Sequence, residues 1–278
     1  MKINHLFLLP LLILTLLATC GGAVAQNTQV YGSERNKFWI DFNAGLGRTT
    51  SFDKSTIPFA YNGFHDLEQV GFTDEWKRCH LQLLGSRIKT KYSDVKGTSD
   101  VKGTSNAYSL DFEFLYSCLK PTVRRWHVWA GASTTNMLEW KNLEDLQNAA
   151  ITVSLFHELN AKGLVQCDFA YDKANDTHPW LTACFGLSLP IYTAASRPTF
   201  AYVQDPLNNI FDAVFGANGP VFKWFPGCTT DLGFNLNLRN GNRIGLFYTW
   251  DYLTTGKKGD YRYDNAFHTI KLSFMFKI

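Results

Sequence analysis

The residues of this chain that could do chemistry stand apart from one another. Its 278 residues include seven histidines and six cysteines, yet no histidine lies two residues before a serine, and no Cys-x-x-Cys pair or His/Cys cluster occurs. Phosphate-binding and nucleotide-binding glycine motifs are also missing. Nucleophilic catalysis needs a nucleophile beside a base, and zinc needs clustered thiolates or imidazoles. The sequence therefore predicts no catalytic residue, no metal ligand and no cofactor.

The N-terminus has the order of a secretory signal. A cation at Lys2 precedes an apolar run over residues 6–18, and Ala23 and Ala25 precede Gln26. We predict a Sec signal peptide over residues 1–25, an N-terminal extension over 26–36 and a single domain over 37–278. An alternative is a lipoprotein signal that ends at Cys20, although Thr19 is unusual before a lipidated cysteine.

Composition narrows the class of protein further. The formal net charge of +3 is small for a chain of this length and argues against nucleic acid as a partner. Five cysteines remain after the predicted cleavage, an odd number that indicates no disulfide framework. After the signal, no run approaches the roughly 18 apolar residues of a membrane helix. If the mature chain enters a membrane, it must do so as a closed β-barrel.

The last eleven residues alternate without exception between apolar and more polar positions. A period of two predicts a strand with two unlike faces. The apolar face consists of Ile270, Leu272, Phe274, Phe276 and Ile278.

The same alternation recurs along the chain. It predicts strands at 37–49, 108–118, 126–133, 149–155, 165–171, 180–189, 230–239 and 244–252. Segments 59–70 and 192–202 are weaker. In segment 76–92 the apolar positions change from odd to even, which predicts a bulge near Gly85. Turn-type residues predict chain reversals at 120–121, 160–163, Pro190 and 240–241.

A final strand with an unbroken apolar stripe and aromatics near its end resembles the closing strand of bacterial outer-membrane β-barrels. The resemblance implies an all-β protein, a single antiparallel transmembrane β-barrel of about 12 strands over 37–278, located in the outer membrane. It also implies contact with membrane lipid and, through the C-terminal strand, with the barrel-assembly machinery. A secreted or periplasmic β-protein would show the same period with its apolar face turned inward. Aromatics at both ends of the predicted strands favour the membrane.

Charged residues fall on the face opposite the apolar stripe. They suit either a water-filled pore whose charges set ion preference or a salt-bridged interior that plugs a narrow barrel. His127 fits a hydrogen-bonded lumen histidine better than a catalytic base, because it has no identifiable nucleophile. The lumen-facing candidates are Asp41, Asp111, Glu113, His127, Asp168, Asp231, Asp251 and Lys271.

One loop has the pattern of a short amphipathic helix. Asp205 and Pro206 suit its N-cap and first turn, and Gly216 suits its C-cap. The helix could pack on the barrel as a lid through its apolar face, constrict the barrel or hold a surface partner. That face consists of Leu207, Ile210, Phe211, Val214 and Phe215.

Three functions remain open from the sequence. The first is a small porin-like conduit for ions or small polar solutes, and the second is a non-conducting surface, scaffold or adhesion protein. The third is a barrel enzyme that modifies lipid or lipopolysaccharide. Barrel enzymes of that kind use a histidine two residues before a serine, and this chain lacks that pair.

Overall fold

The computed structural model describes residues 37–54, 57–76, 78–95, 102–119, 125–143, 151–172, 175–196, 221–255 and 262–278. The chain divides into two units, Met1–Arg35 and Asn36–Ile278. The predicted signal at 1–25 and the predicted loop helix at 205–216 lie outside the described residues and stay predictions. No helix among the described residues is long and apolar enough to span a membrane.

Eleven antiparallel strands make up the described part of the second unit. Long strands are expected from the alternating pattern, and every strand except the eighth is longer than ten residues. They are β1 (Lys37–Asp53), β2 (Ile57–Trp76), β3 (Cys79–Val95), β4 (Gly103–Ser117), β5 (Trp126–Leu143), β6 (Ile151–Asp172), β7 (Asn175–Ser196), β8 (Val221–Trp224), β9 (Gly227–Asn237), β10 (Arg243–Thr255) and β11 (Tyr263–Lys277).

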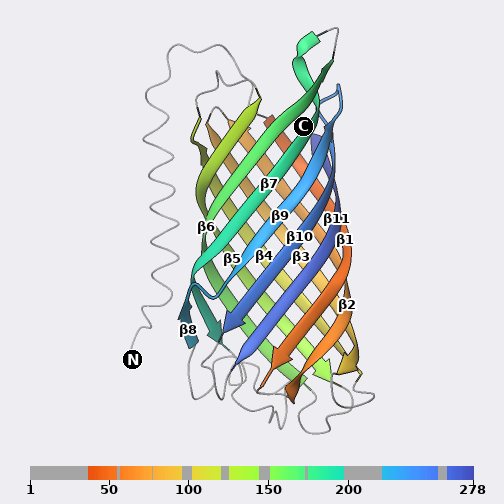
Figure 1. The fold of residues 1–278 in the computed structure, drawn as a ribbon, viewed down its shortest axis with the longest axis vertical. Coiled ribbons are helices and arrows are strands. Elements are labelled where there is room, and N and C mark those ends of the chain that lie inside the picture. Colours follow the sequence, from red (N-terminus) through yellow and green to blue (C-terminus); the bar gives the residue numbers. More distant parts are fainter. Residues whose placement is uncertain are drawn as a thin grey trace. The chain divides into compact units, whose positions relative to one another are not determined.

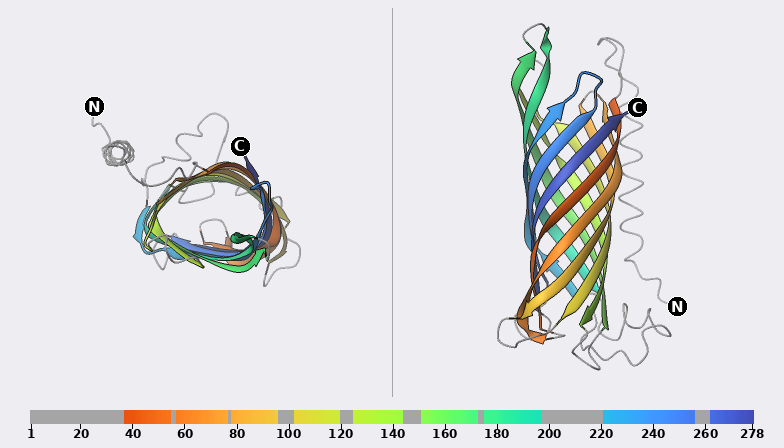
Figure 2. Two further views of the ribbon diagram at one scale, coloured as in Figure 1. Left: turned by 90° about the horizontal axis from the view of Figure 1, so that it is seen from above. Right: turned by 90° about the vertical axis from the view of Figure 1, so that its right-hand side faces the viewer.

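Ten of these strands close into a ring. The hydrogen-bonded order is β6-β5-β4-β3-β2-β1-β11-β10-β9-β7, and a further pairing of β6 with β7 closes it. The final strand β11 pairs with β1 on one side and β10 on the other. Figure 1 shows these strands slanting around the barrel, and the ring is seen along its axis in Figure 2.

The short strand β8 is the additional, eleventh strand of the sheet. It pairs with Tyr192–Ala195 of β7, on the same edge where β9 pairs with Leu181–Ser188. Phe225 separates β8 from β9 and has a positive φ of 49°. A phenylalanine rarely adopts that conformation, so the chain is sharply bent where β8 gives way to the ring strand.

The barrel wall is apolar outside and polar inside. On β1, Leu46 is 67% exposed on the outer face whereas Asp41 is 1% exposed on the inner face. This orientation excludes the secreted β-protein with an inward apolar face. Each ring strand contributes an exposed apolar residue, for example Phe42, Val70, Leu83, Leu110, Leu138, Phe169, Phe185, Leu232, Leu246 and Ile270.

The prediction of about 12 strands is wrong, because two predicted turns lie within strands. Residues 160–163 are part of β6, and Pro190 is part of β7. The described part of 149–155 and the segment 165–171 therefore belong to one strand, and the described part of 192–202 continues β7. The apolar stripe of β6 stays on odd positions across Leu159, Ala161 and Gly163, which is the signal of a continuous strand.

Pro190 is accommodated by an irregularity. Asn160 pairs with Pro190 and Leu159 pairs with Tyr192, so the register shifts by one residue at Ile191. A proline cannot donate a hydrogen bond to a sheet, and bulges are one of the few places where a strand tolerates it. The proline therefore bends the strand without ending it.

The weak segment 59–70 is a strand, as predicted, and belongs to β2. The bulge predicted near Gly85 is wrong, because β3 keeps its register with both neighbours through that residue. Ile88 and Tyr92 point into the barrel, where they are partly or fully buried. Apolar residues near the loop end of β3 thus pack in the interior, which the sequence pattern could not distinguish from a change of face.

The wall generates a test of membrane embedding. Leu272 lies in the outward stripe of β11 and is 48% exposed. We expect Leu272→Arg to lower the unfolding free energy by about 2–4 kcal/mol in lipid vesicles, because a guanidinium in the hydrocarbon is costly. At the strand end, Ile278→Arg is expected to cost about 0–1 kcal/mol. Urea unfolding measures both, and equal costs would contradict a membrane-facing wall.

Candidate functional site in the barrel interior

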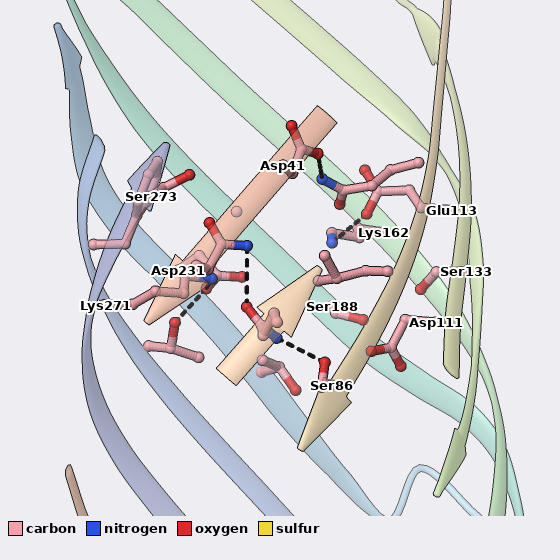
Figure 3. Close-up of a pocket in the computed structure, with 18 of the residues that line it drawn as sticks. Asp41, Ser86, Asp111, Glu113, Ser133, Lys162, Ser188, Asp231, Lys271 and Ser273 are labelled. Atoms are coloured by element: carbon pink, nitrogen blue, oxygen red, sulfur yellow. Dashed lines mark hydrogen bonds and ion pairs between the residues drawn. The ribbon is translucent and has the colours of Figure 1, made fainter. Parts of the chain in front are cut away.

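A cavity of about 340 Å³ lies inside the barrel. Inward residues of all ten ring strands line it, because each strand turns every second side chain toward the axis. Figure 3 shows part of this lining, which is rich in carboxylates, lysines and serines. The interior is therefore a polar site surrounded by an apolar wall.

One series of charged side chains crosses the cavity from β6 to β10. Lys162 forms an ion pair with Glu113, and His80 lies 3.6 Å from Glu113 and 3.5 Å from Glu75. Arg243 donates to both oxygens of Glu75, at 3.2 and 3.4 Å. Five strands contribute one residue each. We call these five residues the Glu75–Lys162 network, in which a lysine, an arginine and an imidazole hold two carboxylates in place.

A second group of inward carboxylates is held by hydroxyl and amide donors. Asp41 accepts hydrogen bonds from Thr73 and, at 3.2 Å, from Gln82. Asp231 accepts one from Thr249 at 2.6 Å and lies 3.9 Å from Lys271. Figure 3 shows Lys271 reaching toward Asp231 from the neighbouring wall. These contacts satisfy buried oxygens that water reaches poorly.

Carboxylates outnumber cations along the cavity. Its lining contains seven carboxylates against three lysine or arginine side chains. Among the described residues, no cation lies within ion-pair distance of Asp111, Glu158 or Asp251. Thr229 donates to Asp251 at 2.7 Å, and Ser109 donates to Asp111 at 3.1 Å. The cavity lining therefore contains more acidic than basic side chains.

A packed layer closes the bore on the side of the long loops. Lys141, only 1% exposed, lies 3.7 Å from Glu139 and has its ammonium 5.2–5.8 Å from three tyrosine ring centroids. Cation–π attraction and ion pairing together compensate its burial. We call this set the Lys141 layer; it consists of Lys141, Glu139, Tyr61, Tyr92, Tyr263 and Phe156.

The contacts of the Lys141 layer span the full width of the ring. Tyr263 on β11 donates to Glu139 on β5 at 3.1 Å, and these two strands are five places apart in the ring of ten. Lys141 also donates to Ser51 on β1 at 3.4 Å. The ring centroids of Phe156 and Tyr263 are 5.3 Å apart. Side chains therefore meet across the bore at this level.

A buried tryptophan and a buried leucine lie at the opposite end. Trp39 is 1% exposed, donates to the carbonyl of Gly241 at 3.0 Å and has its ring 4.2 Å from the Arg243 guanidinium. Leu115 is fully buried near the end of β4. The cavity thus lies between two packed levels.

Six of the eight lumen-facing candidates line the cavity: Asp41, Asp111, Glu113, Asp231, Asp251 and Lys271. The other two form a pair nearer the short-turn end, where His127 lies 3.2 Å from Asp168. Thr182 donates to the second Asp168 oxygen at 2.6 Å. The loop-helix candidates Leu207, Ile210, Phe211, Val214 and Phe215 lie outside the described residues.

Several interior residues do not stand out in the sequence. Lys162 and Asn160 fall in the predicted turn at 160–163, although their even positions oppose the apolar stripe of β6. Lys141, Glu139 and Glu158 lie outside the predicted strands. The phase of the alternating pattern, followed through these positions, would have placed all five inside.

The described part of the interior offers no evident catalytic centre. No group of three or more His, Cys, Asp or Glu among the described residues could hold a metal ion. His65 lies 2.8 Å from Thr269, but the two residues are only 2% and 5% exposed. A nucleophile that a substrate cannot reach does not support hydrolysis.

Comparison with known proteins finds likeness only among solved structures. No protein-family model matches the sequence, and no curated protein matches it. Neisserial surface protein A is 8% identical, with a TM-score of 0.36 over 87% of this chain and 100% of that chain. An outer-membrane channel from Pseudomonas putida is 9% identical, with a TM-score of 0.38 over 90% and 100%. The attachment protein Ail of Yersinia pestis is 10% identical, with a TM-score of 0.27 over 85% and 98%.

The membrane assignment rests on the barrel wall itself. A closed antiparallel ring with an apolar exterior and a charged interior suits hydrocarbon outside and polar contacts inside. The fold is that of an outer-membrane β-barrel. Its location is accordingly the outer membrane, as the sequence predicted.

The Lys141 layer generates a stability prediction. Lys141→Met leaves the Glu139 carboxylate buried without its cation, so we expect a loss of about 3–5 kcal/mol in unfolding free energy. Adding Glu139→Gln should recover part of that loss. The exposed Lys37→Met is the control and should stay within about 0.5 kcal/mol of the wild type. Urea unfolding of the barrel would measure all three, and a small loss for Lys141→Met would contradict the ion-pair role.

Proposed function

We propose that this chain is a non-conducting barrel of the outer membrane that acts as a surface, scaffold or adhesion protein through its outward parts. The Lys141 layer is the observation that carries the proposal, because its side chains meet across the bore from opposite strands. The Glu75–Lys162 network supports it, since paired charges fill a second level of the interior. Export by the predicted signal and insertion by the barrel-assembly machinery belong to the same proposal.

Bilayer recording tests this function. The refolded wild-type barrel is expected to give no conductance steps in a planar bilayer. A variant with Lys141→Gly, Tyr61→Ala and Tyr263→Ala should conduct, because it removes the side chains that meet in the Lys141 layer. A heat-dependent shift in gel mobility shows that each barrel is folded before recording. Regular steps from the wild type would overturn the proposal.

The carboxylate surplus of the cavity favours a second candidate, a cation-preferring conduit gated by the Lys141 layer. Rings of acidic side chains select cations in membrane pores. The three carboxylates without a cation partner among the described residues, Asp111, Glu158 and Asp251, would provide that preference.

Ion preference tests the second candidate in any conducting form. The opened variant described above should favour potassium over chloride when reversal potentials are measured under a salt gradient. Adding Glu158→Gln and Asp251→Asn should reduce that preference severalfold, because it removes two carboxyl groups that have no cation partner among the described residues. The control is Glu68→Gln, on the outer wall, which should leave the reversal potential unchanged. If the opened variant keeps the same potassium preference after both changes are added, the two carboxyl groups do not set that preference.

A further inference from the structure

The outer wall has a hollow over strand β11 and strands β1 to β4. Its volume is about 580 Å³, and it is mostly apolar. Outward side chains surround it, and the ion-paired residues Glu68 and Arg87 stand at its edge. The outward lining residues are Phe42, Ala44, Glu68, Val70, Gly85, Arg87, Tyr108 and Phe274.

Gly85 leaves the floor of this hollow open. A Cβ built on Gly85 would come no nearer to another residue than 3.7 Å, to the carbonyl of Val70. The inward Gly47 and Gly71 differ, because a Cβ there would lie 2.0 and 2.3 Å from backbone oxygens. Packing therefore requires glycine at those two positions and not at Gly85. Ala44 also lines the hollow, and these two small residues leave space on the wall for an acyl chain.

Cations gather on the long-loop side of the hollow. Arg87, Lys89 and Lys91 occupy successive outward positions of β3, and Arg48 lies outward on β1. Arg48 stacks over Phe64 at 5.1 Å, and Phe64 is the register partner of both Arg48 and Lys91. The four cations thus share one patch of neighbouring strands.

Two carboxylates lie among these cations. Glu68 is 3.5 Å from Arg87, and Asp66 is the register partner of Lys89. Four cations against two carboxylates leave a surplus of two positive charges beside an apolar hollow. Charged side chains on the lipid face are costly at the bilayer midplane and tolerated near the interface. The patch therefore marks the level of lipid headgroups.

The lengths of the loops indicate on which side of the membrane the cationic patch lies. In outer-membrane barrels the longer loops face outward, and the patch lies between Gly85 and the loop end of β3. The headgroups at this level belong to the outer leaflet. Phosphate is the group that clustered arginine and lysine side chains bind best at a membrane surface.

We propose that this hollow and its cationic edge form a binding site for a phosphorylated, acylated lipid of the outer leaflet, the lipid A part of lipopolysaccharide. An acyl chain lies against Ala44 and Gly85, and a lipid phosphate contacts Arg87 and Lys89. The inference does not depend on whether the barrel conducts. It requires only the membrane-facing wall.

Native mass spectrometry of the refolded barrel in detergent tests the site. The probes are bisphosphorylated lipid A, phosphatidylglycerol and phosphatidylcholine, each titrated separately. Wild-type protein should retain lipid A at the lowest concentration. Equal retention of phosphatidylglycerol would overturn the choice of lipid A, and equal retention of phosphatidylcholine would overturn phosphate recognition.

Two variants that should weaken binding test the headgroup contacts and the acyl-chain contacts separately; we call them the loss variants. Arg87→Gln with Lys89→Gln and Lys91→Gln should weaken lipid A binding ten- to a hundredfold, since each surface cation contributes about a factor of five. Gly85→Leu should weaken it severalfold by filling the hollow. Matched controls are Lys37→Gln with Lys277→Gln for charge, and Ala132→Leu for bulk on the outer wall; Lys37, Lys277 and Ala132 are exposed.

A gain variant sharpens the test. Glu68→Gln frees Arg87 from its ion pair and is expected to strengthen lipid A binding severalfold. A general loss of folding cannot produce that increase. Gel mobility with and without heating confirms that every variant is folded. Unchanged binding in both loss variants, or weaker binding in Glu68→Gln, would overturn the proposed site.

Discussion

The barrel depends on a closed ring in which every strand pairs with two neighbours. Hydrocarbon offers no water to an unpaired backbone group, so a sheet in a membrane must have no free edge. The strands β6 and β7, 22 residues each, are the longest of the barrel, and their pairing is part of this ring. Closure explains why β7 continues through Pro190: ending the strand there would leave the long-loop half of β6 unpaired, whereas a one-residue shift keeps the pairing.

The alternating pattern predicted which side chains face lipid, and the structure agrees from Phe42 on β1 to Ile270 on β11. The prediction failed where the type of a residue suggested a different structure from its position in the alternating pattern. Asn160, Lys162 and Gly163 resemble a turn, yet a lysine and an asparagine suit a polar lumen equally well. The prediction for Ile88 and Tyr92 failed for the opposite reason, because apolar and aromatic residues also lie inside: Tyr92 belongs to the Lys141 layer and Ile88 lines the cavity. A membrane barrel therefore has an interior that is not uniformly polar.

Individual lumen residues could be predicted, but not their partners. Glu113 was expected inside, whereas its pairing with Lys162 and His80 depends on how far neighbouring strands are staggered. Stagger is set by the closure of the whole ring, which no local pattern contains. The same holds for Tyr263 and Glu139, which are 124 residues apart in sequence. The chemistry of the interior is thus a property of the closed barrel more than of any segment.

The Lys141 layer has a consequence for how the barrel forms. Its members come from β2, β3, β5, β6 and β11, so the buried ammonium has its full set of partners only when the last strand has joined the first. An incompletely closed barrel would expose that ammonium together with several tyrosines. The layer therefore makes assembly cooperative, and it penalises every intermediate in which the ring is still open.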